Sequence, residues 1–210
     1  LANSGLISAV NAGISVSTST MSNGLTNSGT ISSTSGVGIS LLNSSTISGG
    51  IFNSGLIGAN TTAITIGGSS VILGDIFNSG TINSNIATGI RITTSAITGG
   101  IFNSGTISGG GVDSGISIIG NSSISGDITN QGLISAVNGN AIALGLSVIN
   151  GGILNSGRIE SATANGISVS NVSTIQGNIN NSGTLSGGLN GISILSGSTV
   201  GGIQNSGSIS

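Results

Sequence analysis

The chain has 210 residues, of which 40 are glycine and 36% are hydrophobic, with two basic and four acidic residues and a formal net charge of −2. Two basic residues cannot neutralise a phosphate backbone, which excludes nucleic-acid binding as a class of function. Histidine, lysine, cysteine, tyrosine and proline are absent. Their absence excludes disulfides, thiolate metal sites, histidine-based triads and lysine-dependent phosphate loops, so we expect no cofactor and no metal.

The tripeptide Asn-Ser-Gly recurs along the whole chain and is replaced once by Asn-Gln-Gly. Its asparagines, 24 to 27 residues apart, are Asn3, Asn27, Asn53, Asn78, Asn103, Asn130, Asn155, Asn181 and Asn205. A period of this size is typical of an array of one structural unit, and no break in the pattern marks a second domain. We expect residues 1–210 to form a single repeat array. Because both ends fall in mid-repeat, we also expect it to be an excerpt of a longer chain.

Each unit predicts three short strands. The first centres on the asparagine and has aliphatic residues two positions before and four after it, as Ile101 and Ile107 lie around Asn103. The second is an aliphatic pair: Ile14/Val16, Ile39/Leu41, Ile64/Ile66, Ile90/Ile92, Ile116/Ile118, Ile142/Leu144, Ile167/Val169 and Ile192/Ile194. The third is marked by Met21, Ile47, Ile72, Ile97, Ile124, Ile149, Ile175 and Val200. Period-two spacing of β-branched residues indicates strands, and no helical period is sustained.

The charged residues agree with this inward and outward assignment. Arg91 lies between Ile90 and Ile92, and Arg158 and Glu160 flank Ile159. All three therefore fall on outward positions, as the cost of burying a charge requires.

One three-stranded unit cannot bury its apolar face, whereas stacked units can. Parallel strands of successive coils pair at about 4.8 Å, and the inward isoleucines then form continuous columns. The sequence predicts an all-β, right-handed parallel β-helix with three short strands per coil, about 25 residues per coil and roughly eight coils. No apolar run is long enough for a transmembrane segment.

The asparagine shares the inward parity of the isoleucines. We expect the stacked asparagines to hydrogen-bond from coil to coil, which is a structural role. Glycine pairs such as Gly49-Gly50 and Gly99-Gly100 predict a corner with positive φ. The connection between the first and second strands varies in length and is longest at Gly109–Ser114. Variable loops on a rigid scaffold usually carry specificity.

Two patterns leave alternative functions open. Asp75 and Asp127 occupy one corner column two coils apart, roughly 9.6 Å at the usual strand spacing, which is near the upper separation of a glycosidase carboxylate pair. A polysaccharide-cleaving enzyme is therefore one alternative, although aspartate also favours turns. The outward column of Thr30, Thr81, Thr106 and Thr184 suggests an ice-binding face, but Leu6, Leu56, Leu133, Arg158 and Ser208 interrupt it.

Phe52, Phe77 and Phe102 are the only aromatic residues, and they share one outward column in three consecutive coils. An exposed apolar patch of this kind marks an interaction surface. We predict that this ridge binds surface glycans or other copies of the chain; an intramolecular aromatic stack or cover from a neighbouring loop is the alternative.

The frame Gly-Ile-Phe-Asn-Ser-Gly-Thr-Ile-Ser at residues 100–108 resembles the repeats of bacterial autotransporter passengers and of filamentous-haemagglutinin-type surface proteins. This resemblance implies an extracellular rod at the bacterial cell surface that acts as an adhesin stalk or fibre. A non-enzymatic structural or adhesive rod is therefore the function we expect, with a self-assembling filament subunit as a further alternative. Its partners would be other copies, lateral or end-to-end, or surface glycans.

Overall fold

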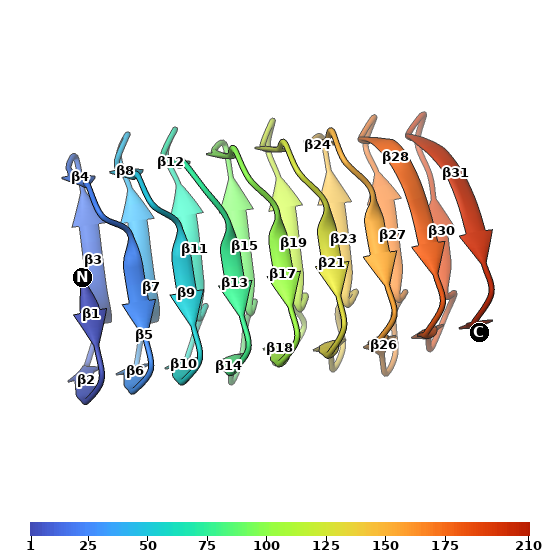
Figure 1. Cartoon of the computed structure of the whole chain (residues 1–210). Helices are drawn as coiled ribbons and strands as arrows, with labels where there is room; N and C mark the ends of the chain where they lie inside the picture. The colour runs from blue at the N-terminus through green and yellow to red at the C-terminus, as the bar shows by residue number, and fades with distance from the viewer.

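A computed structural model describes all residues from 1 to 210. The chain winds into a right-handed solenoid of about eight coils, and three parallel sheets run along its length (Figure 1). The first and last coils lie at opposite ends of the stack. The predicted β-helix, its period and its all-β content are confirmed. The chain forms no helix, and therefore it has no helix that is long and apolar enough to cross a membrane.

Sheet B and sheet C each take one strand from every coil. Sheet B contains β2 (Leu6–Ala9), β6 (Thr30–Ser33), β10 (Leu56–Ala59), β14 (Thr81–Ser84), β18 (Thr106–Gly109), β22 (Leu133–Ala136), β26 (Arg158–Ser161), β29 (Thr184–Gly187) and β32 (Ser208–Ile209). Sheet C contains β3 (Ala12–Ser17), β7 (Val37–Leu42), β11 (Ile64–Gly67), β15 (Ile90–Thr93), β19 (Ile116–Ile119), β23 (Ile142–Gly145), β27 (Ile167–Ser170) and β30 (Ile192–Ile194).

Sheet A takes two short strands from most coils. The strands that end at the repeated asparagine are β1 (Ala2–Asn3), β5 (Leu25–Asn27), β9 (Ile51–Asn53), β13 (Ile76–Asn78), β17 (Ile101–Asn103), β21 (Ile128–Asn130) and β25 (Ile153–Asn155). The strands that precede them are β4 (Thr20–Met21), β8 (Thr46–Ile47), β12 (Val71–Ile72), β16 (Ala96–Ile97), β20 (Ser123–Ile124) and β24 (Val148–Ile149). In the last coils the two join into the single strands β28 (Thr174–Asn181) and β31 (Thr199–Asn205).

The strand boundaries differ from the expected ones at the repeated asparagine. The predicted first strand bends at Asn-Ser-Gly, so that its two halves lie in sheets A and B, and the predicted third strand shares sheet A with the first half. The two turn residues Ser and Gly preserve the even count between inward positions. The bend therefore leaves no trace in the alternation of apolar residues.

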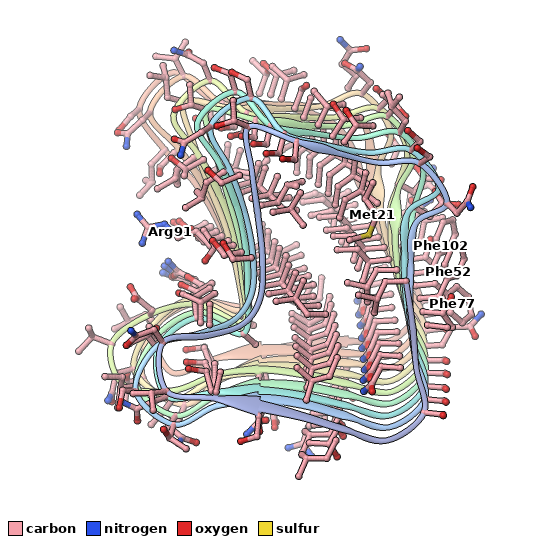
Figure 2. The ribbon with its side chains drawn as sticks, turned by 90° about the vertical axis from the view of Figure 1, so that its left-hand side faces the viewer. Met21, Phe52, Phe77, Arg91 and Phe102 are labelled. Atoms are coloured by element: carbon pink, nitrogen blue, oxygen red, sulfur yellow. The ribbon has the colours of Figure 1, made fainter.

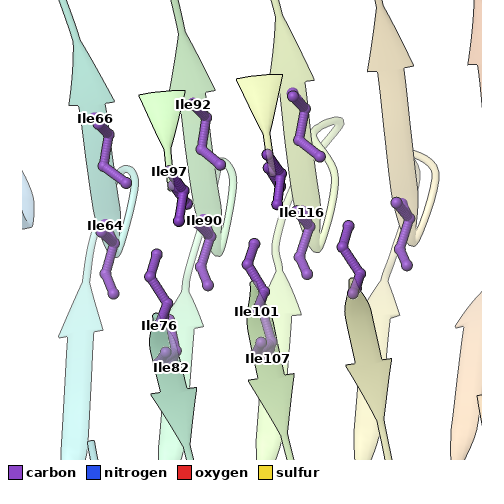
Figure 3. Packing of buried hydrophobic residues seen from close by; sticks show 14 of the residues in the cluster. Ile64, Ile66, Ile76, Ile82, Ile90, Ile92, Ile97, Ile101, Ile107 and Ile116 are labelled. Atoms are coloured by element: carbon purple, nitrogen blue, oxygen red, sulfur yellow. The ribbon is translucent and has the colours of Figure 1, made fainter. Parts of the chain in front are cut away.

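One continuous hydrophobic cluster of 37 buried residues fills the solenoid. Isoleucines from the three sheets meet in its interior and repeat from coil to coil, as Ile76, Ile82 and Ile90 do (Figure 3). Register is continuous along sheets B and C, so each inward column is unbroken. The inward assignment is confirmed in the inner coils. At the two ends the same positions are partly exposed, because only one coil covers them.

The glycine corner needs glycine chiefly for a reason other than positive φ. Positive φ occurs there at Gly24, Gly50 and Gly74 but not at Gly100. A Cβ on Gly100 would instead lie 2.5 Å from the carbonyl oxygen of Asp127 in the next coil, so close packing between coils excludes a side chain. Left-handed backbone concentrates at the corner after sheet C, at Thr18, Asn43, Ser44, Ser69, Thr94, Asn121, Leu146, Asn171, Val172 and Ser196.

Candidate functional site

The repeated asparagines form a buried ladder along the corner between sheets A and B. Each Nδ2 donates a hydrogen bond to the Oδ1 of the asparagine in the next coil, giving eight consecutive bonds of 2.7–2.8 Å. Each Nδ2 also donates to the carbonyl of the motif glycine, as Asn103 does to Gly105. The expected structural role is confirmed. The ladder fixes the edge of sheet A from one coil to the next.

The motif glycine is fixed by the same stacking. A Cβ on Gly105 would lie 2.0 Å from the carbonyl oxygen of Gly80 in the preceding coil. The middle residue of the motif points outward. It is the only motif position at which the residue type changes, from serine to Gln131 in one coil. The outward serines therefore form a regular hydroxyl column beside the asparagine ladder.

A second polar ladder was not anticipated from the sequence. At the corner after sheet C, the backbone N–H of one serine donates to the Oγ of the serine in the next coil, with seven such bonds of 3.0–3.3 Å. The column is Ser19, Ser45, Ser70, Ser95, Ser122, Ser147, Ser173 and Ser198. The sequence contains a signal for this ladder, because serine stands two positions before the third-strand aliphatic residue in every unit.

The three phenylalanines lie in one row on the outer side of sheet A. Phe52, Phe77 and Phe102 pair in register on β9, β13 and β17. Figure 2 shows the rings pointing away from the solenoid on one side, whereas Met21 points inward and Arg91 points outward elsewhere. Phe52 and Phe77 are each 42% exposed. No loop of the chain covers these two rings, so the expected outward ridge is present.

The rings of Phe77 and Phe102 are stacked, with centroids 6.4 Å apart and planes inclined by 30°. The intramolecular aromatic stack that was the alternative is therefore present for this pair. The two rings border a hollow of about 140 Å³ that Ser104, Thr129 and Gln131 also line. The ridge therefore combines aromatic surface with hydroxyl and amide groups.

A wider polar hollow continues the first one along sheet A. It has a volume of about 410 Å³, shares Thr129 with the first hollow and has Leu154 as its one hydrophobic lining residue. Its other lining residues are serines, asparagines and Gln204. We call the two hollows together the sheet A groove. The aromatic end of the groove was predicted from the sequence. The polar end was not, because it lacks any distinctive residue type.

The groove contains one unsatisfied polar atom. Asn180 occupies the same outward column as the phenylalanines, and its Oδ1 is buried without a hydrogen-bond partner. Most buried polar atoms in proteins have such a partner. This oxygen is the one unsatisfied buried side-chain atom of the chain, and because it is closed to solvent, a molecule in the groove does not contact it.

Asp75 and Asp127 lie at the glycine corner, as expected, and each caps the coil that follows. The Oδ1 of Asp75 accepts a hydrogen bond of 2.8 Å from the N–H of Gly100. The Oδ1 of Asp127 accepts one of 2.7 Å from Gly152. From Gly50 onward, aspartate or asparagine thus alternates with glycine from coil to coil, because each side chain occupies space that only glycine leaves free. These contacts give both carboxylates a structural role.

A further apolar row, which was not predicted from the sequence, lies on the variable connection between sheets B and C. The exposed residues of this row include Ile86, Val112 and Val137, which lie in consecutive coils, and Val112 is 77% exposed.

On sheet B, the predicted outward charges Arg158 and Glu160 form an ion pair. The threonine column of that sheet is in register but remains interrupted by Leu56 and Leu133.

The chain matches no protein-family model, no curated protein and no solved structure. Its fold and its surface are therefore the grounds for a functional proposal.

Proposed function

We propose that this chain is a non-enzymatic structural or adhesive rod of an extracellular bacterial surface protein. The observation that carries the proposal is a single uninterrupted core under an exposed aromatic ridge. A stack of coils whose core and polar ladders never break resists bending, so it can hold a contact surface at a fixed distance. The repeat frame at residues 100–108, which resembles that of autotransporter passengers, supports the extracellular location.

Adhesion by the isolated protein tests this proposal. Beads coated with the chain should adhere to polysaccharide- or protein-coated surfaces more strongly than beads coated with an unrelated protein of similar charge. Triple substitution of Phe52, Phe77 and Phe102 by serine should reduce that adhesion while the circular dichroism spectrum stays unchanged. Equal adhesion by the wild-type and triple variant would remove the ridge from the proposal.

Location and catalysis can be tested separately. On intact source cells the chain should be accessible to an added antibody, and exclusive recovery from the cytoplasm would contradict an extracellular rod. Incubation with polysaccharides should release no new reducing ends. Turnover that disappears in the Asp127→Asn variant would instead establish the enzyme alternative.

A filament subunit is a second candidate, favoured by the exposed phenylalanine row and the sparse charge. Little electrostatic repulsion opposes side-by-side association of molecules with a net charge of −2. Concentration-dependent association in sedimentation experiments, lost in the triple phenylalanine variant, would support this second candidate.

A further inference from the structure

We propose that the sheet A groove binds a neutral polysaccharide chain that lies parallel to the solenoid axis. This inference rests on the proposed adhesive function and names the class of ligand. The groove runs from Phe77 to Gln204 along one outward column. These residues belong to six successive coils, so the column spans five coil spacings, or about 24 Å.

The aromatic end offers a stacking platform. The faces of pyranose rings carry C–H groups that pack favourably on the negative face of an aromatic ring. Phe77 and Phe102 present two such rings in adjacent coils, with hydroxyl and amide groups of Ser104 and Gln131 beside them. An apolar platform with a few convergent polar groups is the usual composition of a ligand site.

The polar end offers hydrogen bonds to sugar hydroxyls. The outward amides of Asn180 and Gln204 lie beside the serine column, while Asn155 and Asn181 are held in the asparagine ladder. The Oδ1 of Asn180 is closed to solvent, so the exposed amide of Gln204 and the serine hydroxyls are the groups that a sugar can reach.

The electrostatics favour a neutral ligand. No charged residue lines either part of the groove. An acidic polysaccharide or a charged peptide would lose hydration there without gaining an ion pair. The coil spacing of about 4.8 Å is also close to the length of one pyranose residue, so successive sugars can lie over successive coils.

Binding to a panel of polysaccharides tests the inference. The purified chain is incubated with cellulose, chitin, starch and mannan, with alginate as an acidic probe, and the unbound protein is measured. We expect binding to at least one neutral polymer and none to alginate. The double substitution Phe77→Ser and Phe102→Ser should weaken binding by about tenfold or more, because it removes both aromatic contacts of the site.

Val112→Ser is the control, because Val112 is an exposed apolar residue on the connection between sheets B and C and does not line the groove. It should leave affinity within about twofold of wild type. Gln204→Ala should weaken binding without changing secondary structure, which tests the polar end independently.

Three results would overturn the inference. They are no binding to any neutral polymer, equal losses for Val112→Ser and the double variant, or self-association of the chain that is lost when the three phenylalanines are replaced, which would identify a second copy of the chain as the occupant. Bead adhesion that persists and depends on the phenylalanines, without polysaccharide binding, would leave the adhesive rod standing and reject only this ligand class.

Discussion

At the scale of single residues, the interior of this solenoid is specified by polar side chains as well as by isoleucine. Each buried asparagine both donates and accepts along the stack, so its amide is satisfied in every inner coil. An asparagine in one coil therefore depends on the asparagines above and below it. This mutual dependence fixes the register between coils, which apolar columns alone leave free to slip by an even number of residues.

Replacing Asn103 by alanine should lower the free energy of unfolding by about 2–3 kcal/mol, because the Oδ1 of Asn130 loses its donor inside the protein. Denaturant titration followed by circular dichroism measures this loss. Gln131→Ser, at the outward position of the next motif, is the control and should stay within about 0.5 kcal/mol of wild type. A loss below that limit for Asn103→Ala would show that the ladder contributes little.

Ile107 and its neighbour Ser108 test the inward and outward assignment. Ile107 is fully buried in β18, whereas Ser108 points outward. Ile107→Asp should cost several kcal/mol, since it buries an unpaired charge. Ser108→Asp should be nearly neutral in the same denaturation assay. Similar destabilisation by both changes would mean that the assignment is wrong.

At the scale of elements, the sequence predicted the strands and their stacking because both depend on periodicity. Alternation identified the inward faces, and the period of about 25 residues identified the coil. The serine ladder around Ser95 and the left-handed residues such as Thr94 escaped prediction. Each depends on contacts between coils or on backbone angles, which leave no change in the hydrophobic pattern.

The candidate site was predictable in part for the same reason. The row of Phe52, Phe77 and Phe102 stood out because aromatic residues occur nowhere else in the chain. The polar end around Asn180 could not be identified, since asparagine and serine are common throughout the repeats. Only the structure shows which of them point outward into one groove.

The motif glycines provide a test of stacking between elements. Gly105→Ala would place a Cβ 2.0 Å from the carbonyl oxygen of Gly80, so the two coils must separate locally. We expect a loss of about 2–3 kcal/mol, the usual cost of overpacking. Gly5→Ala at the equivalent position of the first coil meets no atom within 4 Å and should be tolerated. Comparable melting temperatures for the two variants would refute this account of the motif.

At the scale of the whole molecule, each coil contacts only its neighbours, so stability is expected to vary along the axis. Inward residues of the inner coils, such as Ile101, are fully buried, while Leu1 and Ile203 in the end coils are 48% and 49% exposed. The end coils therefore lack half of the burial that holds an inner coil. Charge does little to offset this difference, because the chain has one ion pair, whose arginine is exposed.

Hydrogen exchange measured by mass spectrometry should resolve this gradient. Amides of β15, β17 and β18 in the central coils should exchange slowest, and protection should fall steadily toward β1 and β32, because local opening begins where fewest contacts must break. Substituting Ile107 by alanine should speed exchange in its own and adjacent coils before it affects either end. Uniform protection along the chain would instead indicate that all coils open together. Fast exchange confined to the central coils would show that the core, although continuous in structure, is interrupted in stability.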